Sequence, residues 1–83
     1  AIVTLGCVIR GETPHFDYVC SAANDGVAAV AREASIPILF GVLTTDNREQ
    51  ALARAGKGSS NKGYEAAVAA LQMVDLYARL AGN

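Results

Sequence analysis

The chain has 83 residues, of which 52% are apolar and 18% charged, and its formal net charge is −1. This composition is typical of one small, ordered globular domain rather than of a disordered tail. A net charge so close to zero argues against nucleic acid or an anionic membrane as the main partner, because both need a basic patch, and no apolar run in the chain reaches the length of a bilayer span.

The first predicted element is a strand over residues 1–9, AIVTLGCVI. It is nearly all apolar, as parallel strands covered on both faces are. Because two parallel strands alone would bury too little surface, we expect upstream sequence or another chain to complete the sheet. Cys7 in this strand and Cys20 in the next element lack the spacing of a metal knuckle, so we interpret them as reduced, packed thiols of a cytosolic protein.

The turn RGETP ends the strand and starts a helix that we expect to run to about Ser35. We expect Thr13 to be its N-cap and Pro14 to occupy the first helical position. Gly26 weakens the helix interior, and we attribute it to close packing against a neighbouring element. Spacings of three and four give the helix one apolar face, formed by Phe16, Val19, Ala23, Val27, Val30 and Ala34.

A second apolar strand is predicted over residues 37–45, PILFGVLTT. Asp46 and Glu49 have the spacing of a capping box for a short helix, NREQALARA, and Gly56 is expected to end that helix in the left-handed conformation. A polar, glycine-rich loop follows. The last helix is expected from about residue 61 to about residue 80, with an apolar stripe of Ala67, Val68, Leu71, Val74 and Ala78.

This order of strand, helix, strand, helix, helix predicts an α/β fold with parallel strands. In open α/β sheets, ligands bind at the carboxyl ends of the strands. The segments RGETPH and TTDN follow the two strands there, and we place Phe40, within the second strand, in the same region.

The turn before the first helix has two interpretations. The amides of Gly11, Glu12 and Thr13 could turn inward beside the helix N-terminus and bind a phosphate, or the turn could be an ordinary connection capped by Thr13. His15 lies at the positive end of the helix dipole, which favours a neutral imidazole able to accept or donate a proton. The alternative is a histidine that is hydrogen-bonded to the turn or simply solvated.

Further charged and aromatic side chains have either a structural or a functional interpretation. Arg54 is either a surface cation at a helix C-terminus or a bidentate phosphate clamp. Lys62 is a cation at a helix start, which suggests a ligand or an acidic partner. Phe40 interrupts an aliphatic strand as a core residue or as a stacking platform. Arg10 and Glu12 flank the turn as a solvated pair that stabilises little.

Three stretches of the chain, GCVIRGETPHFDYV, FGVLTTDNREQALARAG and NKGYEAAVAALQM, closely resemble the lumazine synthase family, in order and at the expected spacing. The resemblance covers essentially the whole chain. Because chains of that family are longer, it implies that residues 1–83 are the C-terminal half of a single domain. The implied fold is a three-layer α/β/α, flavodoxin-like parallel sheet, of which this chain holds the strand-helix-strand-helix-helix part.

The resemblance also implies an activity. The family condenses 5-amino-6-(D-ribitylamino)uracil with 3,4-dihydroxy-2-butanone 4-phosphate to give 6,7-dimethyl-8-ribityllumazine, phosphate and water, with no metal or organic cofactor. The alternatives are a non-catalytic subunit that forms shells or binds flavin, and the related archaeal-type riboflavin synthase. The intact RGETPHFDYV and LTTDNREQALARAG stretches favour lumazine synthase over the latter.

The implied site is shared between neighbouring subunits of a cytoplasmic homo-oligomer, either a pentamer or an icosahedral shell of sixty copies, with riboflavin synthase as a further partner. His15 corresponds to the catalytic histidine. Phe40 and Arg54 would reach into the neighbour's site. Glu65, like Lys62, falls near the active site. By group, the expected pyrimidine and ribityl contacts are Cys7, Val8, Ile9, Phe40 and Lys62, and the expected phosphate contacts are Glu12, Thr13 and Arg54.

Overall fold

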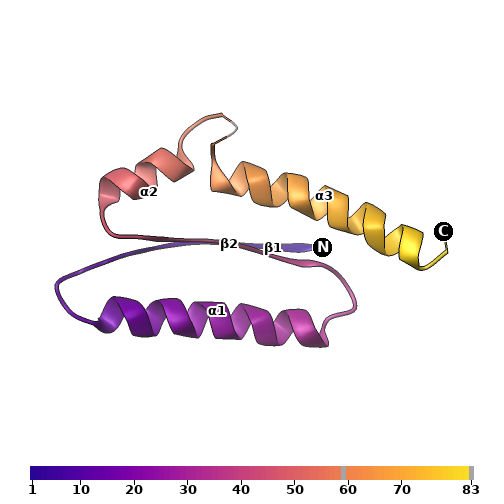
Figure 1. The fold of residues 1–83 in the computed structure, drawn as a ribbon, viewed down its shortest axis with the longest axis horizontal. Helices are drawn as coiled ribbons and strands as arrows, with labels where there is room; N and C mark the ends of the chain where they lie inside the picture. The colour runs from indigo at the N-terminus through magenta and orange to yellow at the C-terminus, as the bar shows by residue number, and fades with distance from the viewer. Residues whose placement is uncertain (59, 83) are drawn as a thin grey trace.

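The chain contains two strands and three helices in the predicted order, as a computed structural model shows for residues 1–58 and 60–82. The five elements are β1 (Ile2–Ile9), α1 (His15–Glu33), β2 (Ile38–Thr45), α2 (Arg48–Ala55) and α3 (Lys62–Leu80). They form three layers, with α1 on one face of the sheet and α2 and α3 on the other (Figure 1). The α/β class and the parallel sheet expected from the sequence are therefore confirmed.

The two strands pair in parallel without a break. Ile2 is opposite Ile38 and Ile9 is opposite Thr45, and the ladder continues one step further because the amide of Arg10 donates to the carbonyl of Thr45 at 2.8 Å. The carboxyl ends of β1 and β2 consequently lie side by side. Both segments that the sequence places after the strands are held at this end of the sheet.

The core of this chain is small. Its extents are 50 × 30 × 11 Å, and the shortest one reflects a sheet that is only two strands wide. Among the residues that the structure describes, the buried ones are Pro37, Thr45, Ala51 and Ala66, and none of the large side chains is fully buried. Leu5 in β1 is 70% exposed, so helices on both faces of the sheet do not close its edges.

The start of α1 differs from the prediction by one residue. Pro14 is the N-cap, with φ −70° and ψ 2°, and no side chain caps the helix. Thr13 only accepts a long hydrogen bond of 3.4 Å from the amide of His15. The fixed φ of proline already suits a helix, so Pro14 can take the boundary position itself. At the other end, α1 stops at Glu33, because Ala34 is extended ahead of Pro37.

The cap of α2 is shifted by one residue as well. Asn47, rather than Asp46, is the N-cap, and its side-chain oxygen accepts from the amide of Gln50 at 2.8 Å. The side-chain oxygen of Gln50 in turn accepts from the amide of Asp46 at 2.8 Å. The predicted Asp46–Glu49 pair is thus replaced by a reciprocal pair one position later, and the Asp46 carboxylate is left free for another contact.

The prediction that Gly56 ends α2 in the left-handed conformation is wrong. Its φ and ψ are −74° and 177°, which is extended, and Gly58 takes the positive φ of 104° instead. The carbonyl of Gly56 accepts a hydrogen bond of 2.7 Å from the side-chain amide of Asn61. Asn61 also caps α3, since its oxygen accepts from the amide of Tyr64 at 2.9 Å. One asparagine therefore joins the end of α2 to the start of α3.

The predicted stripe of α3 lies on the outward side of the helix, so that prediction is also wrong. The better-covered side of α3 carries small residues, and Ala66 packs against the sheet where a Cβ on Gly41 would be 3.5 Å from it. Small side chains occupy this face because they let the helix approach the strands closely. The better-covered residues are Gly63, Ala66, Ala69, Ala70 and Met73; the predicted ones, all exposed, are Ala67, Val68, Leu71, Val74 and Ala78.

The structure also tests the predictions for the apolar side of α1 and for Gly26 within it. The apolar side of α1 is half-buried as predicted, except for the exposed Val30. Gly26 has no atom within 4 Å of where its Cβ would be, so the packing neighbour we expected is not found within residues 1–58 and 60–82. Within the same residues, none of the three helices is both long and apolar enough to cross a membrane.

Candidate functional site

The first part of the candidate site is the strand-end turn, which we define as residues 10–15. It connects the carboxyl end of β1 to α1, and the side chains of Glu12, Thr13 and His15 are all exposed in it. Among the described residues, the amides of Gly11, Glu12 and Thr13 donate no hydrogen bond. Free amides ahead of a 19-residue helix give the turn the donors and the partial positive charge that an anion needs.

The last three residues of β1 lead into this turn. Cys7, Val8 and Ile9 pair with Leu43, Thr44 and Thr45, so their backbones are fixed by the parallel ladder. Cys7 and Ile9 are exposed, and Val8 is half-buried. The strand thus presents a rigid edge directly beside the strand-end turn, which suits the backbone contacts expected of these residues.

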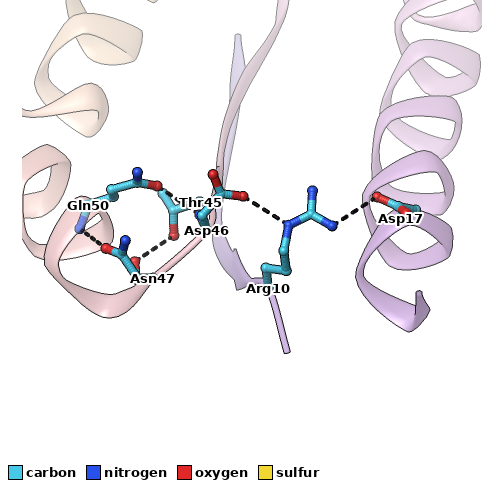
Figure 2. A network of polar contacts seen from close by, with 6 residues as sticks. All are labelled: Arg10, Asp17, Thr45, Asp46, Asn47 and Gln50. Carbon is cyan, nitrogen blue, oxygen red and sulfur yellow. Dashed lines mark hydrogen bonds and ion pairs between the residues drawn. The ribbon is translucent and has the colours of Figure 1, made fainter. Parts of the chain in front are cut away.

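Arg10 organises the polar groups around the turn, as Figure 2 shows. Its Nε donates to Oδ1 of Asp46 at 2.9 Å, and its Nη1 lies 3.7 Å from Oδ1 of Asp17. Its guanidinium carbon is also 4.3 Å from the ring centroid of Phe16. The hydrogen bond to Asp46, more than any other cause, raises the pKa of Arg10, so the guanidinium stays charged. Because its paired carboxylates among the described residues are Asp46 and Asp17, the expected pair of Arg10 and Glu12 is wrong.

The same network continues into α2. Thr45, which is buried, donates its hydroxyl to the carbonyl of Asn47 at 3.1 Å, and the cap formed by Asn47 and Gln50 follows directly (Figure 2). Because Asp46 lies between Thr45 and this cap, the Arg10 ion pair ties the strand-end turn to the start of α2. The sequence could have indicated this, since Arg10 and Asp46 follow neighbouring parallel strands.

The second part of the candidate site is a cavity of about 400 Å³ between β2, α2 and α3, which we call the β2–α2–α3 cavity. Phe40, Arg54, Lys62 and Glu65 line it. Phe40 is the third residue of β2, opposite Thr4, so it does not lie at the carboxyl end of the sheet where we had placed it. The cavity joins an aromatic ring, two cations and a carboxylate on one face of the sheet.

The charged groups of this cavity are held by their own helices. Nη1 of Arg54 donates to the carbonyl of Gln50 at 3.1 Å, one turn earlier in α2. Nζ of Lys62 lies 2.8 Å from Oε2 of Glu65, so the acidic partner expected for a cation at this helix start is present. Within residues 1–58 and 60–82, no hydrogen bond or ion pair joins either cation to a side chain of another element.

The end of β1 joins the two parts of the site, because Cys7 and Val8 pair with Leu43 and Thr44, which line the β2–α2–α3 cavity. Cys7 and Arg54 line a hollow of about 270 Å³ on the α2 and α3 face of the sheet. Neither this hollow nor the larger cavity is lined by Glu12, Thr13 or His15. Among the described residues, no hydrogen bond or ion pair joins Arg54 to the strand-end turn, so one chain does not bring the expected phosphate ligands together. The described part of the chain also has no cluster of three His, Cys, Asp or Glu side chains placed to hold a metal ion.

Comparison with known proteins identifies the family. The family model for 6,7-dimethyl-8-ribityllumazine synthase matches residues 1–78. The chain belongs to this family. Curated relatives named 6,7-dimethyl-8-ribityllumazine synthase include those of Chlorobaculum tepidum and Clostridium kluyveri, each 58% identical over 80 residues. The relative from Chlorobaculum parvum is 55% identical over the same length.

These matches cover 96% of this chain but only 51–52% of the relatives, so the chain spans about half the length of the curated relatives it matches. The parallel sheet between helix layers is consistent with the flavodoxin-like fold that the resemblance implied, over part of the domain.

Proposed function

We propose that residues 1–83 are the C-terminal part of a lumazine synthase domain. The complete chain then condenses 5-amino-6-(D-ribitylamino)uracil with 3,4-dihydroxy-2-butanone 4-phosphate to form 6,7-dimethyl-8-ribityllumazine, phosphate and water. The observation that carries this proposal is the strand-end turn, in which three amides without a hydrogen-bond acceptor among the described residues precede an exposed histidine, in a chain that belongs to this family.

The chemistry needs a proton carrier close to a bound phosphate. An amine attacks a ketone, water leaves, phosphate is eliminated and a ring closes, and each of these steps moves a proton. His15 is an exposed histidine at the end of the strand-end turn, and an imidazole can accept and then return these protons. Most of the acceleration comes from holding the two substrates together and from stabilising the phosphate charge.

In this proposal the phosphate meets ligands from two subunits. Glu12 and Thr13 contribute the turn of one subunit, and Arg54 is supplied by its neighbour. Cys7, Val8 and Ile9 bind the pyrimidine and ribityl groups, while Phe40 and Lys62 border the heterocycle from the neighbouring copy. The separate positions of the strand-end turn and the β2–α2–α3 cavity on one chain support such sharing.

Sharing of this kind requires a homo-oligomer, and we propose a pentamer or an icosahedral shell built from pentamers, working in the cytoplasm and able to deliver its product to riboflavin synthase. A non-catalytic assembly subunit is the outcome to be distinguished from this. It would keep the assembly and bind ligands without turnover.

Steady-state kinetics on a complete chain that carries these 83 residues, with each substrate varied in turn, tests the proposal. We expect His15→Ala to lower kcat by about 10- to 10⁴-fold with little change in the KM of the butanone phosphate. Arg54→Ala should instead raise that KM by roughly 10- to 100-fold, because a charge-assisted bidentate contact is lost, and should leave the KM of the pyrimidine almost unchanged.

Two further variants control the test. Arg54→Lys should recover only part of the loss, since an ammonium group cannot reproduce the guanidinium fork. Arg48→Ala, on the same helix and also exposed, should behave like the wild type. Absence of lumazine formation by the wild-type complete chain would favour the assembly subunit, and a kinetically silent His15→Ala would remove the histidine from the mechanism.

A further inference from the structure

The side chain of Arg10 joins the end of β1 to the end of β2 and to the first turn of α1. It leaves β1, pairs with Asp46 at the end of β2, and reaches Asp17 and the ring of Phe16 in the first turn of α1. The strand-end turn begins at Arg10 and ends at the start of α1. The guanidinium therefore connects both ends of the turn to the neighbouring strand (Figure 2).

The turn has few other anchors. The amide of Arg10 donates to Thr45, the amide of Asp17 donates to Pro14, and the amide of His15 makes its long contact with Thr13. Between these points, the described part of the chain supplies no hydrogen bond to the amides at 11–13, and a Cβ on Gly11 would have no atom within 4 Å. The path of the turn thus depends on how firmly its two ends are held.

We propose that Arg10 is a positioning residue that fixes the strand-end turn so that its amides meet the substrate phosphate and His15 meets the reacting groups. The inference rests on the proposed function above. Arg10 acts through Asp46 and Asp17 rather than by touching a substrate. Its role depends on guanidinium geometry, because only a fork can direct Nε to one carboxylate and Nη1 to another while its plane lies over an aromatic ring.

The contacts also predict where the effect of losing Arg10 will be seen. Its side chain is 45% exposed, and ion pairs at such positions stabilise a fold little. A small displacement of groups that bind a substrate, in contrast, can lower the rate by up to about 100-fold. We therefore expect variants of this network to change phosphate recognition and turnover far more than thermal stability.

The test uses Arg10→Lys and Asp46→Asn in the complete chain, with inorganic phosphate as the binding probe and both substrates in steady-state kinetics. Each variant should weaken phosphate binding by about 10-fold, raise the KM of the butanone phosphate, lower kcat, and leave the KM of the pyrimidine almost unchanged. The double variant should be no worse than either single one, because both remove the same contact. Asp17→Asn should have a smaller effect, since its contact is the longer one.

A matched control lies on α3. Arg79 and Asp75 form an ion pair with the same Nε-to-carboxylate distance of 2.9 Å, but within one helix and away from the turn. Arg79→Lys and Asp75→Asn should leave phosphate binding and both KM values unchanged. A response equal to that of the Arg10 and Asp46 variants would show a general charge effect and overturn the proposal.

The remaining outcomes separate this inference from the proposed function. Wild-type phosphate binding and kinetics in Arg10→Lys would overturn it, as would a loss of activity that only follows a fall in melting temperature with both KM values unchanged. If the wild-type chain forms no lumazine but Arg10→Lys and Asp46→Asn still weaken phosphate binding, the proposed reaction fails and the positioning role stands.

Discussion

Helices α1 and α3 have the same length, 19 residues, and each covers one face of the sheet, yet they do so differently. α1 places its predicted apolar side on the strands and carries polar residues such as Asp25 and Arg32 outside. α3 places alanines on the strands and leaves larger apolar side chains outside, including Leu71, which is 74% exposed. A helix that is apolar on both sides is normally buried on both. The comparison indicates that α3, more than α1, carries large apolar side chains that the sheet of this chain leaves exposed.

The largest effect expected from this difference concerns the isolated 83-residue chain. With Ala51 and Ala66 as its buried apolar residues and the outer side of α3 uncovered, we expect no cooperative thermal transition for this chain as a monomer. Circular dichroism during heating, with the monomeric state checked by sedimentation, measures this. A sharp, reversible transition of the monomer would show that the core described here is sufficient.

A smaller effect is expected at the contact that lets α3 approach the sheet. A Cβ on Gly41 would lie 2.6 Å from the carbonyl oxygen of Thr4 and 3.1 Å from Leu5, and a backbone atom cannot easily move away. Gly41→Ala should therefore destabilise the complete protein by about 1–3 kcal/mol. Gly6→Ala, on the partner strand, meets only Val42 at 3.6 Å and is the control for a lost glycine. Denaturant midpoints that are equal for the two variants would contradict the close contact.

The smallest effect, with the opposite sign, is expected on α1. Nothing lies within 4 Å of a Cβ on Gly26, and alanine favours a helix interior over glycine. Gly26→Ala should stabilise the complete protein by up to about 1 kcal/mol, measured by the same denaturation. A destabilised variant would instead reveal the close neighbour that the sequence suggested, supplied from outside this chain, and α1 would then resemble α3.

The order and type of all five elements could be predicted from the sequence, because apolar runs and helical spacings are long and regular here. The ends of the elements could not. The N-cap of α2 is Asn47 rather than the predicted Asp46, and the Asp46 carboxylate instead accepts from Arg10. The Arg10–Asp46 contact joins residues 36 positions apart, which local sequence patterns do not show. The stripe of α3 was misassigned because side-chain size, rather than hydrophobicity, decides which of two apolar sides fits the strands.

The sequence predicts which residues form the candidate site, which stays a prediction, and the structure corrects the expected position of one of them. The resemblance indicated His15, Arg54 and Phe40, but Phe40 lies near the start of β2, and the roles of all three stay predictions. The pairing of Arg10 with Asp46 and Asp17 was not predicted from the sequence, because Glu12 is the nearer carboxylate along the chain. The parallel strand ends bring Asp46 closer in space, and a local view of charge pairs cannot show that.

The uniform register of the sheet links the length of α1 to the way this chain folds. Each of the eight residue pairs between β1 and β2 joins positions that are 36 apart, so closing one loop brings all eight pairs into register. The entropic cost of closing a loop grows only slowly with the length of the loop. As a helix, α1 spans about 28 Å, close to the roughly 26 Å of an eight-residue strand. Because the two lengths are similar, a formed α1 returns the chain to the beginning of β1. The start of β2 then lies beside the start of β1, where the two strands pair.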